Sequence, residues 1–382
     1  MQQAHAPRIS PTIAGDGSGP PTLSLMDRFL PVWIFAAMGL GILLGQLIPM
    51  LGEKLDAVQV AGVSLPIAIG LLWMMYPVLA RVSYESLGRF QTQGRLFATS
   101  MVFNWLIGPL LMFGLAWLFL PDQPEYRNGL ILIGIARCIA MVLIWNMLAR
   151  GDGDTAAVLV AINSVFQIVM YSVFGWLLLT VVPGWFGAEQ STIDISIWTI
   201  AKNVLIFLGI PLVAGFLTRR ILRPRKGADW YDNRFMLRLG PTALLGLLYT
   251  IVIMFSLQGD RIIELPLDVL RIAAPLLIYF IVMFGLAFIV SQRLGFDYPQ
   301  TAALSFTAAG NNFELAIAVA VGLFGITSGE ALAGVVGPLI EVPALIALVY
   351  LSLWLRDRLF PAAAAAGEPV VVPTTSAGRR LT

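Results

Sequence analysis

The chain has 382 residues, of which 58% are hydrophobic and 12% are charged, and its mean hydropathy is +0.84. With about half the charge of an average soluble domain, the composition excludes a water-soluble globular protein and indicates a polytopic membrane protein. The net charge of +2 is small and the basic residues are scattered among loops, which excludes a nucleic-acid partner.

Ten apolar segments come close to the ~20 residues that a transmembrane helix needs. We expect each to be helical, because an open backbone in lipid would leave its N–H and C=O groups unpaired. The predicted spans are 29–49, 63–80, 96–120, 128–149, 155–182, 195–217, 241–257, 269–290, 299–324 and 331–355. The segments on either side, 1–25 and 359–382, are rich in Pro, Gly and Ala and are predicted to be disordered.

Basic residues gather at alternate ends of these spans. They precede the first span and follow the second, fourth, sixth, eighth and tenth, with seven of them in a predicted connection at 218–240. Cytoplasmic loops carry the excess of Lys and Arg. The sequence therefore predicts a multi-pass protein of the cytoplasmic membrane, with both termini in the cytoplasm.

A predicted outer loop near 183–194 leaves five spans on each side of it. Because five is odd, the second half starts on the opposite face of the membrane, so that equivalent helices are antiparallel. This inverted repeat is a known plan of secondary transporters, and their broken helices mark the binding site. We therefore predict two five-helix repeats, 26–190 and 191–358.

The fourth span contains Arg137 and Cys138, the only cysteine in the chain. An intramembrane charge costs at least ~2.5–3.5 kcal/mol on insertion scales, so its default interpretation is a functional site in a protein-lined cavity. A helix break between Gly134 and Arg137 would put the thiol at the start of a half-helix beside a cation. Both neighbours favour the thiolate, the form that binds soft metals and metalloids.

The ninth span contains Glu314, preceded by Gly310, Asn311 and Asn312. Glycine relaxes the backbone and Asn can satisfy freed backbone groups, so this run predicts a second helix break. Glu314 would then lie in the first turn of a half-helix, where the helix dipole favours the carboxylate while burial favours the neutral acid. Such a group can gain and lose a proton.

Structural interpretations of these residues stay open. A lone cysteine in a transmembrane helix is commonly a small packing residue, which is the alternative for Cys138. Glu314 could form a purely structural ion pair with Arg137. Glu341 in the tenth span is a second intramembrane acid and a rival proton carrier, although Pro338 and Pro343 on either side of it also favour a hinge.

Four stretches, 65–85, 134–152, 309–325 and 335–348, resemble the ten-span arsenite efflux permeases of the bile acid/arsenite/riboflavin transporter superfamily. The resemblance runs from about residue 25 to 358. It implies a panel of spans one, two, six and seven, and a core of spans three to five and eight to ten, whose fourth and ninth helices unwind and cross near the midplane. It places the family's essential thiol on Cys138 and its essential carboxylate on Glu314.

The implied function is a secondary transporter, not an enzyme, that extrudes trivalent arsenic in exchange for protons within a lipid bilayer. Arsenite is the expected substrate, antimonite stays open, and no cofactor is expected. The alternative is a sodium-coupled organic-anion symporter of the bile-acid type. The candidate residues are Cys138, Asn311, Asn312 and Asn146 for substrate binding, Glu314 and Glu341 for proton coupling, and Arg137 as a supporting cation.

Overall fold

The computed structural model describes residues 29–48, 59–60, 63–82, 93–139, 141–185, 196–264 and 266–361. Nearly all of them are helical. The α-helices are α2 (Leu30–Leu47), α4 (Leu65–Arg81), α5 (Gly94–Val102), α6 (Gly108–Phe119), α7 (Pro124–Ile135), α8 (Val142–Leu148), α9 (Gly153–Trp176), α10 (Val182–Trp185), α11 (Ile197–Val204), α12 (Ile210–Lys226), α13 (Ala228–Trp230), α14 (Met236–Glu264), α15 (Pro266–Arg293), α16 (Tyr298–Ala309), α17 (Phe313–Phe324) and α18 (Gly329–Leu359). The predicted leader, the tail beyond 361 and most of the predicted outer loop lie outside the described residues.

Short π-helical segments continue several of these helices. They are η2 (Phe103–Ile107), η3 (Leu177–Val181), η4 (Leu205–Gly209) and η5 (Tyr231–Phe235). Two two-residue strands, β1 (Gln59–Val60) and β2 (Val63–Ser64), pair antiparallel ahead of α4. Six of the described helical runs are long and apolar enough to cross a bilayer, which fits a polytopic membrane protein.

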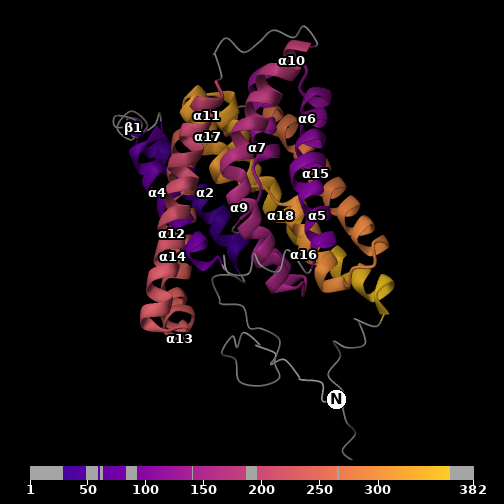
Figure 1. The fold of residues 1–382 in the computed structure, drawn as a ribbon. Coiled ribbons are helices and arrows are strands. Elements are labelled where there is room, and N and C mark those ends of the chain that lie inside the picture. Colours follow the sequence, from indigo (N-terminus) through magenta and orange to yellow (C-terminus); the bar gives the residue numbers. More distant parts are fainter. Residues whose placement is uncertain are drawn as a thin grey trace, which may run out of the picture.

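The helices pack in two groups (Figure 1). In the first, α14 lies against α2 and α4, and α12 also packs on α4. In the second, α15 packs on α6, α16 and α18, while α7 packs on α6 and α18 and α17 packs on α18. The two groups meet where α17 contacts α4 and η4.

Side-chain caps start several of the helices. Asp152, Ser196, Asp297 and Ser328 each accept a hydrogen bond from a backbone N–H in the first turn of α9, α11, α16 and α18. A cap of this kind stabilises a helix by about 1 kcal/mol. These polar residues also mark where the chain leaves the apolar interior.

The segment predicted as a connection at 218–240 is helical instead. α12 continues to Lys226 and α13 begins at Ala228, so the chain reverses at Gly227 alone, which has φ +91°. Glycine adopts this conformation at no steric cost. The predicted connection is therefore helical, because Arg and Lys, although they mark a membrane boundary, are good helix formers.

The hinge considered around Glu341 is not a helix break. α18 runs unbroken from Gly329 to Leu359, with Pro338 and Pro343 inside it.

Candidate functional site

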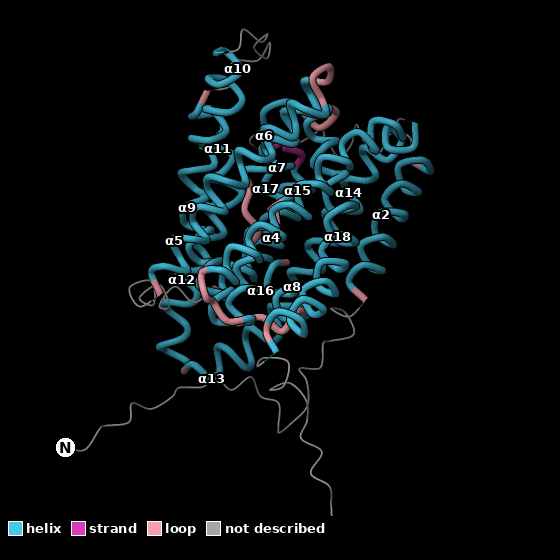
Figure 2. Tube along the Cα trace, turned by 90° about the vertical axis from the view of Figure 1, so that its right-hand side faces the viewer, coloured by secondary structure: helices cyan, strands magenta, loops and turns pink. Residues whose placement is uncertain are grey.

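Two of the apolar segments are interrupted halfway. α7 ends at Ile135 and α8 begins at Val142, while α16 ends at Ala309 and α17 begins at Phe313. Figure 2 shows α7 and α17 in the half of the molecule that ends at α10, and α8 and α16 in the half that ends at α13. The two interruptions therefore face each other in the middle of the bundle.

The interrupted segments pair with each other as a short antiparallel ladder. Arg137 and Asn311 form its central bridge. The backbone N–H of Cys138 donates to the carbonyl oxygen of Gly310 at 3.3 Å, and the N–H of Asn312 donates to that of Ala136 at 3.0 Å. Unwound backbone inside lipid is tolerated only where such groups are satisfied by protein, so each segment stabilises the other.

Amide side chains complete this ladder. Asn311 Nδ2 donates to the carbonyl oxygens of Ile133 at 2.7 Å and Ala136 at 3.2 Å, where α7 ends. Asn312 Oδ1 accepts from the N–H of Leu315 at 3.1 Å and so caps α17. Both asparagines are buried.

Cys138 lies within the ladder and is only 3% exposed. Its Sγ accepts a hydrogen bond from the N–H of Val142, the first residue of α8, at 3.3 Å. A Cβ on Gly310 would lie 3.0 Å from Cys138 Cβ and 3.5 Å from Sγ. The absence of a side chain on Gly310 therefore allows Cys138 to pack closely against the opposite strand of the ladder.

Arg137 is fully buried, and neutral groups hold its guanidinium. Nη1 donates to the Tyr279 hydroxyl at 2.9 Å, and Nη2 donates to the carbonyl oxygen of Gly134. A Cβ on Gly108 would lie 2.7 Å from Nη1, so this glycine makes room for the cation. Among the described residues no ion pair joins Arg137 to Glu314, so the structural pairing considered for them is absent.

Glu314 lies in the first turn of α17, as the position of the break predicts. It lines a narrow apolar gap together with Leu315 from its own helix, Leu71 and Met75 from α4, and Phe207 and Leu208 from η4. The carboxyl group therefore lies where the two groups of helices meet.

Glu341 on α18 also reaches the ladder, where its Oε1 accepts the N–H of Asn311 at 3.3 Å. The side chain is only 2% exposed. On the other strand of the ladder the N–H of Arg137 donates to Oε1 of Gln167 on α9. Glu341 and Gln167 each lie 30 residues beyond the ladder residue that they bind.

Similarity to known proteins identifies the family of this chain. Residues 68–265, about half of the chain, match the Sodium Bile acid symporter family. The arsenical-resistance protein Acr3 of Corynebacterium glutamicum is 53% identical over 90% of this chain and 92% of its own length. That of Alkaliphilus metalliredigens is 33% identical over 89% and 95%, and an uncharacterized transporter of Synechocystis sp. is 35% identical over 90% and 91%.

The chain belongs to the arsenite efflux permease family. It is therefore a membrane transport protein of the arsenical-resistance class and not an enzyme. The 53% identity to an arsenical-resistance protein does not favour the alternative function, a sodium-coupled organic-anion symporter.

In this permease the sequence-predicted residues do not all converge. Cys138, Arg137, Asn311, Asn312 and Glu341 lie on the ladder or bind it, and Glu314 begins the helix that follows it. Asn146 lies toward the end of α8 that is away from the ladder. Its Oδ1 packs against Gly151, where an added Cβ would lie only 1.9 Å away, so Asn146 is not part of the candidate site.

The sequence did not single out two residues of the candidate site, Gln167 and Tyr279. Both are completely buried on apolar helices. A polar side chain inside a predicted span was the available signal, but it does not say which of several such residues reaches the break.

Several buried polar atoms at the ladder lack a hydrogen-bond partner. Within the described part of the chain these are Arg137 Nε, Gln167 Nε2, Asn311 Oδ1 and Asn312 Nδ2. Each such atom costs about 1–3 kcal/mol when left unsatisfied. Donors and acceptors with no protein partner, beside a thiol, can receive a small polyhydroxylated ligand.

Proposed function

We propose that this protein extrudes trivalent arsenic from the cytoplasm as arsenite, in exchange for protons. The observation that carries the proposal is the ladder. It contains Cys138, the only cysteine of the chain, and buried hydrogen-bonding groups without a protein partner. Glu341 binds one strand of the ladder, and Glu314 begins the helix that follows that strand. The relatives named as arsenical-resistance proteins support the choice of substrate.

The proposed architecture is ten spans in two inverted five-helix repeats. A constant offset of 174 residues supports it, because α7 (Pro124–Ile135) shifted by 174 covers 298–309, the range of α16. The same shift carries the run from Gly153 to Trp185 onto 327–359, close to α18. It also relates Arg137 to Asn311, so the bridge lies on the proposed axis of symmetry.

The proposed substrate site centres on Cys138. At neutral pH trivalent arsenic is mostly the uncharged hydroxide, so it needs a soft ligand and hydrogen bonds more than a strong field. One As–S bond forms when the thiol displaces a hydroxyl of arsenite, which leaves as water with the thiol proton, and hydrolysis reverses this step and permits release. A cage of three thiolates would hold the metalloid too tightly for turnover. The hydrogen bond from the N–H of Val142 orients Sγ at the start of α8.

The unsatisfied amide atoms of Asn311 and Asn312 would bind the hydroxyl groups. Arg137 contributes a positive charge on the same strand as the thiol, held in place by its neutral partners. We therefore assign it a supporting role.

The proposed proton carrier is Glu314, with Glu341 as the second acid. Glu341 accepts the N–H of Asn311 and Glu314 begins the helix that follows Asn312, so both acids adjoin the same strand of the ladder. Proton and arsenite would oppose each other's binding by the same factor, since coupling between two sites is reciprocal. Mutually exclusive occupancy then gives exchange.

Alternating access would come from movement between the two groups of helices. The panel is α2, α4 and the helices of the run from α11 to α14, and the core contains the ladder. Glu314 faces the panel across a gap lined by apolar side chains. Protonation there would remove a charge from the surface along which the two parts slide.

Arsenite uptake into everted membrane vesicles, with and without an imposed pH difference, tests the proposal. Cys138→Ala should abolish uptake while the protein still reaches the membrane, and Glu314→Gln should remove the response to the pH difference. Glu330→Gln is the control, because Glu330 is a buried acid in the first turn of α18, eleven residues before Glu341.

Normal uptake by a well-inserted Cys138→Ala protein would rule out a required thiol. A Glu314→Gln protein that still responds to the pH difference would move the proton role to Glu341. Uptake driven by a sodium gradient and indifferent to pH would favour the organic-anion symporter.

A further inference from the structure

A pocket of about 130 Å³ lies at the turn between α12 and α13, the lower end of the molecule in Figure 1. Its lining consists of Arg219, Arg220, Arg223, Pro224 and Ala228. Three of the five lining residues are thus arginines, and none is acidic. The pocket is remote from the ladder, and the proposed transport cycle does not use it.

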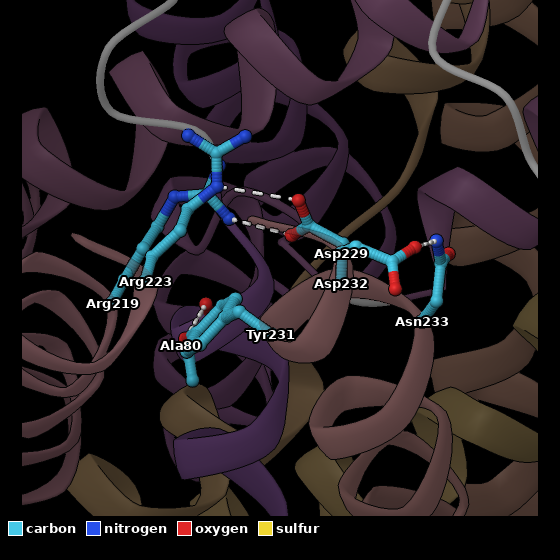
Figure 3. A network of polar contacts seen from close by, with 7 residues as sticks. All are labelled: Ala80, Arg219, Arg223, Asp229, Tyr231, Asp232 and Asn233. Carbon is cyan, nitrogen blue, oxygen red and sulfur yellow. Dashed lines mark hydrogen bonds and ion pairs between the residues drawn. The ribbon is translucent and has the colours of Figure 1, made fainter. Parts of the chain in front are cut away.

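The charges around this pocket are strongly unbalanced. Residues 219–238 include seven basic and two acidic side chains. Figure 3 shows Asp232 between two of the arginines, at 3.6 Å from Arg219 and 3.2 Å from Arg223. One carboxylate therefore serves two cations, and Arg220 adds a third, so the pocket retains a net positive charge.

Buried contacts hold the pocket in shape. Arg219 is only 6% exposed, and its guanidinium carbon lies 5.7 Å from the centre of the Tyr231 ring. The Tyr231 hydroxyl donates to the carbonyl oxygen of Ala80 at 2.8 Å, which ties η5 to the end of α4 (Figure 3). Because the site is already organised, an anion would bind without first ordering a flexible loop.

The position of the pocket relative to the apolar surface points to a lipid. The exposed face of α12 carries Ile210, Val213, Leu217 and Ile221, spaced three or four residues apart as one stripe of a helix requires. Arg220 and Pro224 continue this stripe at its end. A ligand in the pocket would therefore lie directly beyond the surface that faces acyl chains, which is the level of the headgroups.

We propose that this pocket binds the phosphate of an anionic phospholipid whose acyl chains lie along the apolar stripe of α12. Arginine matches phosphate geometry with paired hydrogen bonds. Basic pockets between helices on the cytoplasmic side are suited to acidic headgroups, and the positive-inside pattern predicts this side for the α12–α13 turn. The bound lipid would fix the end of the panel against the bilayer.

The test measures retained lipid on the purified full-length protein. The protein is placed in nanodiscs of phosphatidylcholine with a fraction of phosphatidylglycerol, then released and analysed by native mass spectrometry. We expect phosphatidylglycerol to be retained over phosphatidylcholine, and Arg220→Ala to weaken that retention about five-fold, the effect of one arginine near an anionic surface. Arg220 is exposed, so its removal should leave the fold intact.

Arg225→Ala is the matched control. It removes the same charge from the same end of α12 at an exposed position that does not line the pocket, and it should leave retention unchanged. An equal loss in both variants would show a diffuse surface charge and overturn the proposal. So would equal retention of the two lipids.

An inorganic phosphate arm distinguishes a lipid headgroup from a free anion. We expect millimolar phosphate to leave phosphatidylglycerol bound, because it cannot replace the contacts of the acyl chains. Complete displacement by phosphate would mean a site for a free anion and would refute the lipid assignment.

Discussion

Gly310→Ala separates the packing of the ladder from its chemistry. Gly310 has φ −72° and ψ 146°, a conformation open to any residue, so alanine brings no backbone strain. Its Cβ, however, would lie 3.0 Å from Cys138 Cβ, whereas carbon atoms at optimal contact are about 3.5–4.0 Å apart. Cys138 must therefore give way by a few tenths of an ångström.

The expected effect on stability is small. Overpacking of this kind typically costs about 1–3 kcal/mol. Replacing glycine by alanine restores about 0.4–1 kcal/mol, because the unfolded chain has fewer conformations to lose. The two terms leave a net destabilisation of about 0–2.5 kcal/mol.

Transport depends on the position of the reacting group, where a displacement of about 1 Å can cost a factor of about 100. For a shift of a few tenths of an ångström, we expect arsenite uptake by everted vesicles to fall by a factor of about three to ten at equal amounts of folded protein. Gly114→Ala on α6 is the control, since a Cβ there would meet nothing within 4 Å. Normal uptake by a folded Gly310→Ala protein would refute a site that depends on close approach of the two strands.

Three further variants probe the surroundings of the ladder. Tyr279→Phe removes a hydrogen-bond acceptor from the buried Arg137 and should lower the free energy of unfolding by about 1.5–3 kcal/mol, measured by denaturant titration in detergent; an unchanged midpoint would contradict that role. Glu341→Gln keeps an oxygen for the Asn311 N–H, so we expect normal folding but an altered pH dependence of uptake, and a wild-type pH profile would exclude this acid from coupling. The pKa of Asp122 is lowered by its hydrogen bond from an arginine of α15. Any stability that this pair adds is therefore present above the ordinary Asp pKa and is lost as the pH falls through the lowered value. Because the pair is exposed, Asp122→Asn should leave the thermal midpoint at neutral pH unchanged, and a marked drop in that midpoint would show a larger role.

The sequence was most informative where a residue type dictates backbone behaviour. Gly310, Asn311 and Asn312 interrupt an apolar run, and α16 ends immediately before them. The first interruption includes Ala136, Arg137 and Cys138, whose residue types carry no comparable backbone signal. They leave the helix where the carbonyl oxygen of Ala136 and the N–H of Cys138 pair with the other segment, and such a long-range contact cannot be read from local sequence.

The same reasoning explains which site residues were found. Cys138, Arg137 and Glu314 stood out because their chemistry is rare in an apolar span. Gln167 did not stand out, because a neutral amide in a helix has many possible partners.

The ladder is close to symmetric in geometry but not in chemistry. The N–H of Arg137 and the N–H of Asn311 each donate to a side-chain oxygen 30 residues further along the chain, yet one acceptor is the amide of Gln167 and the other is the carboxyl group of Glu341. Only the second can exchange a proton. The proposed thiol ligand lies on one strand and the ionisable acids belong to the other half, so each repeat would contribute a different partner to the exchange. Because both strands share their hydrogen bonds, neither half could change its occupancy without the other, which is what coupled exchange requires.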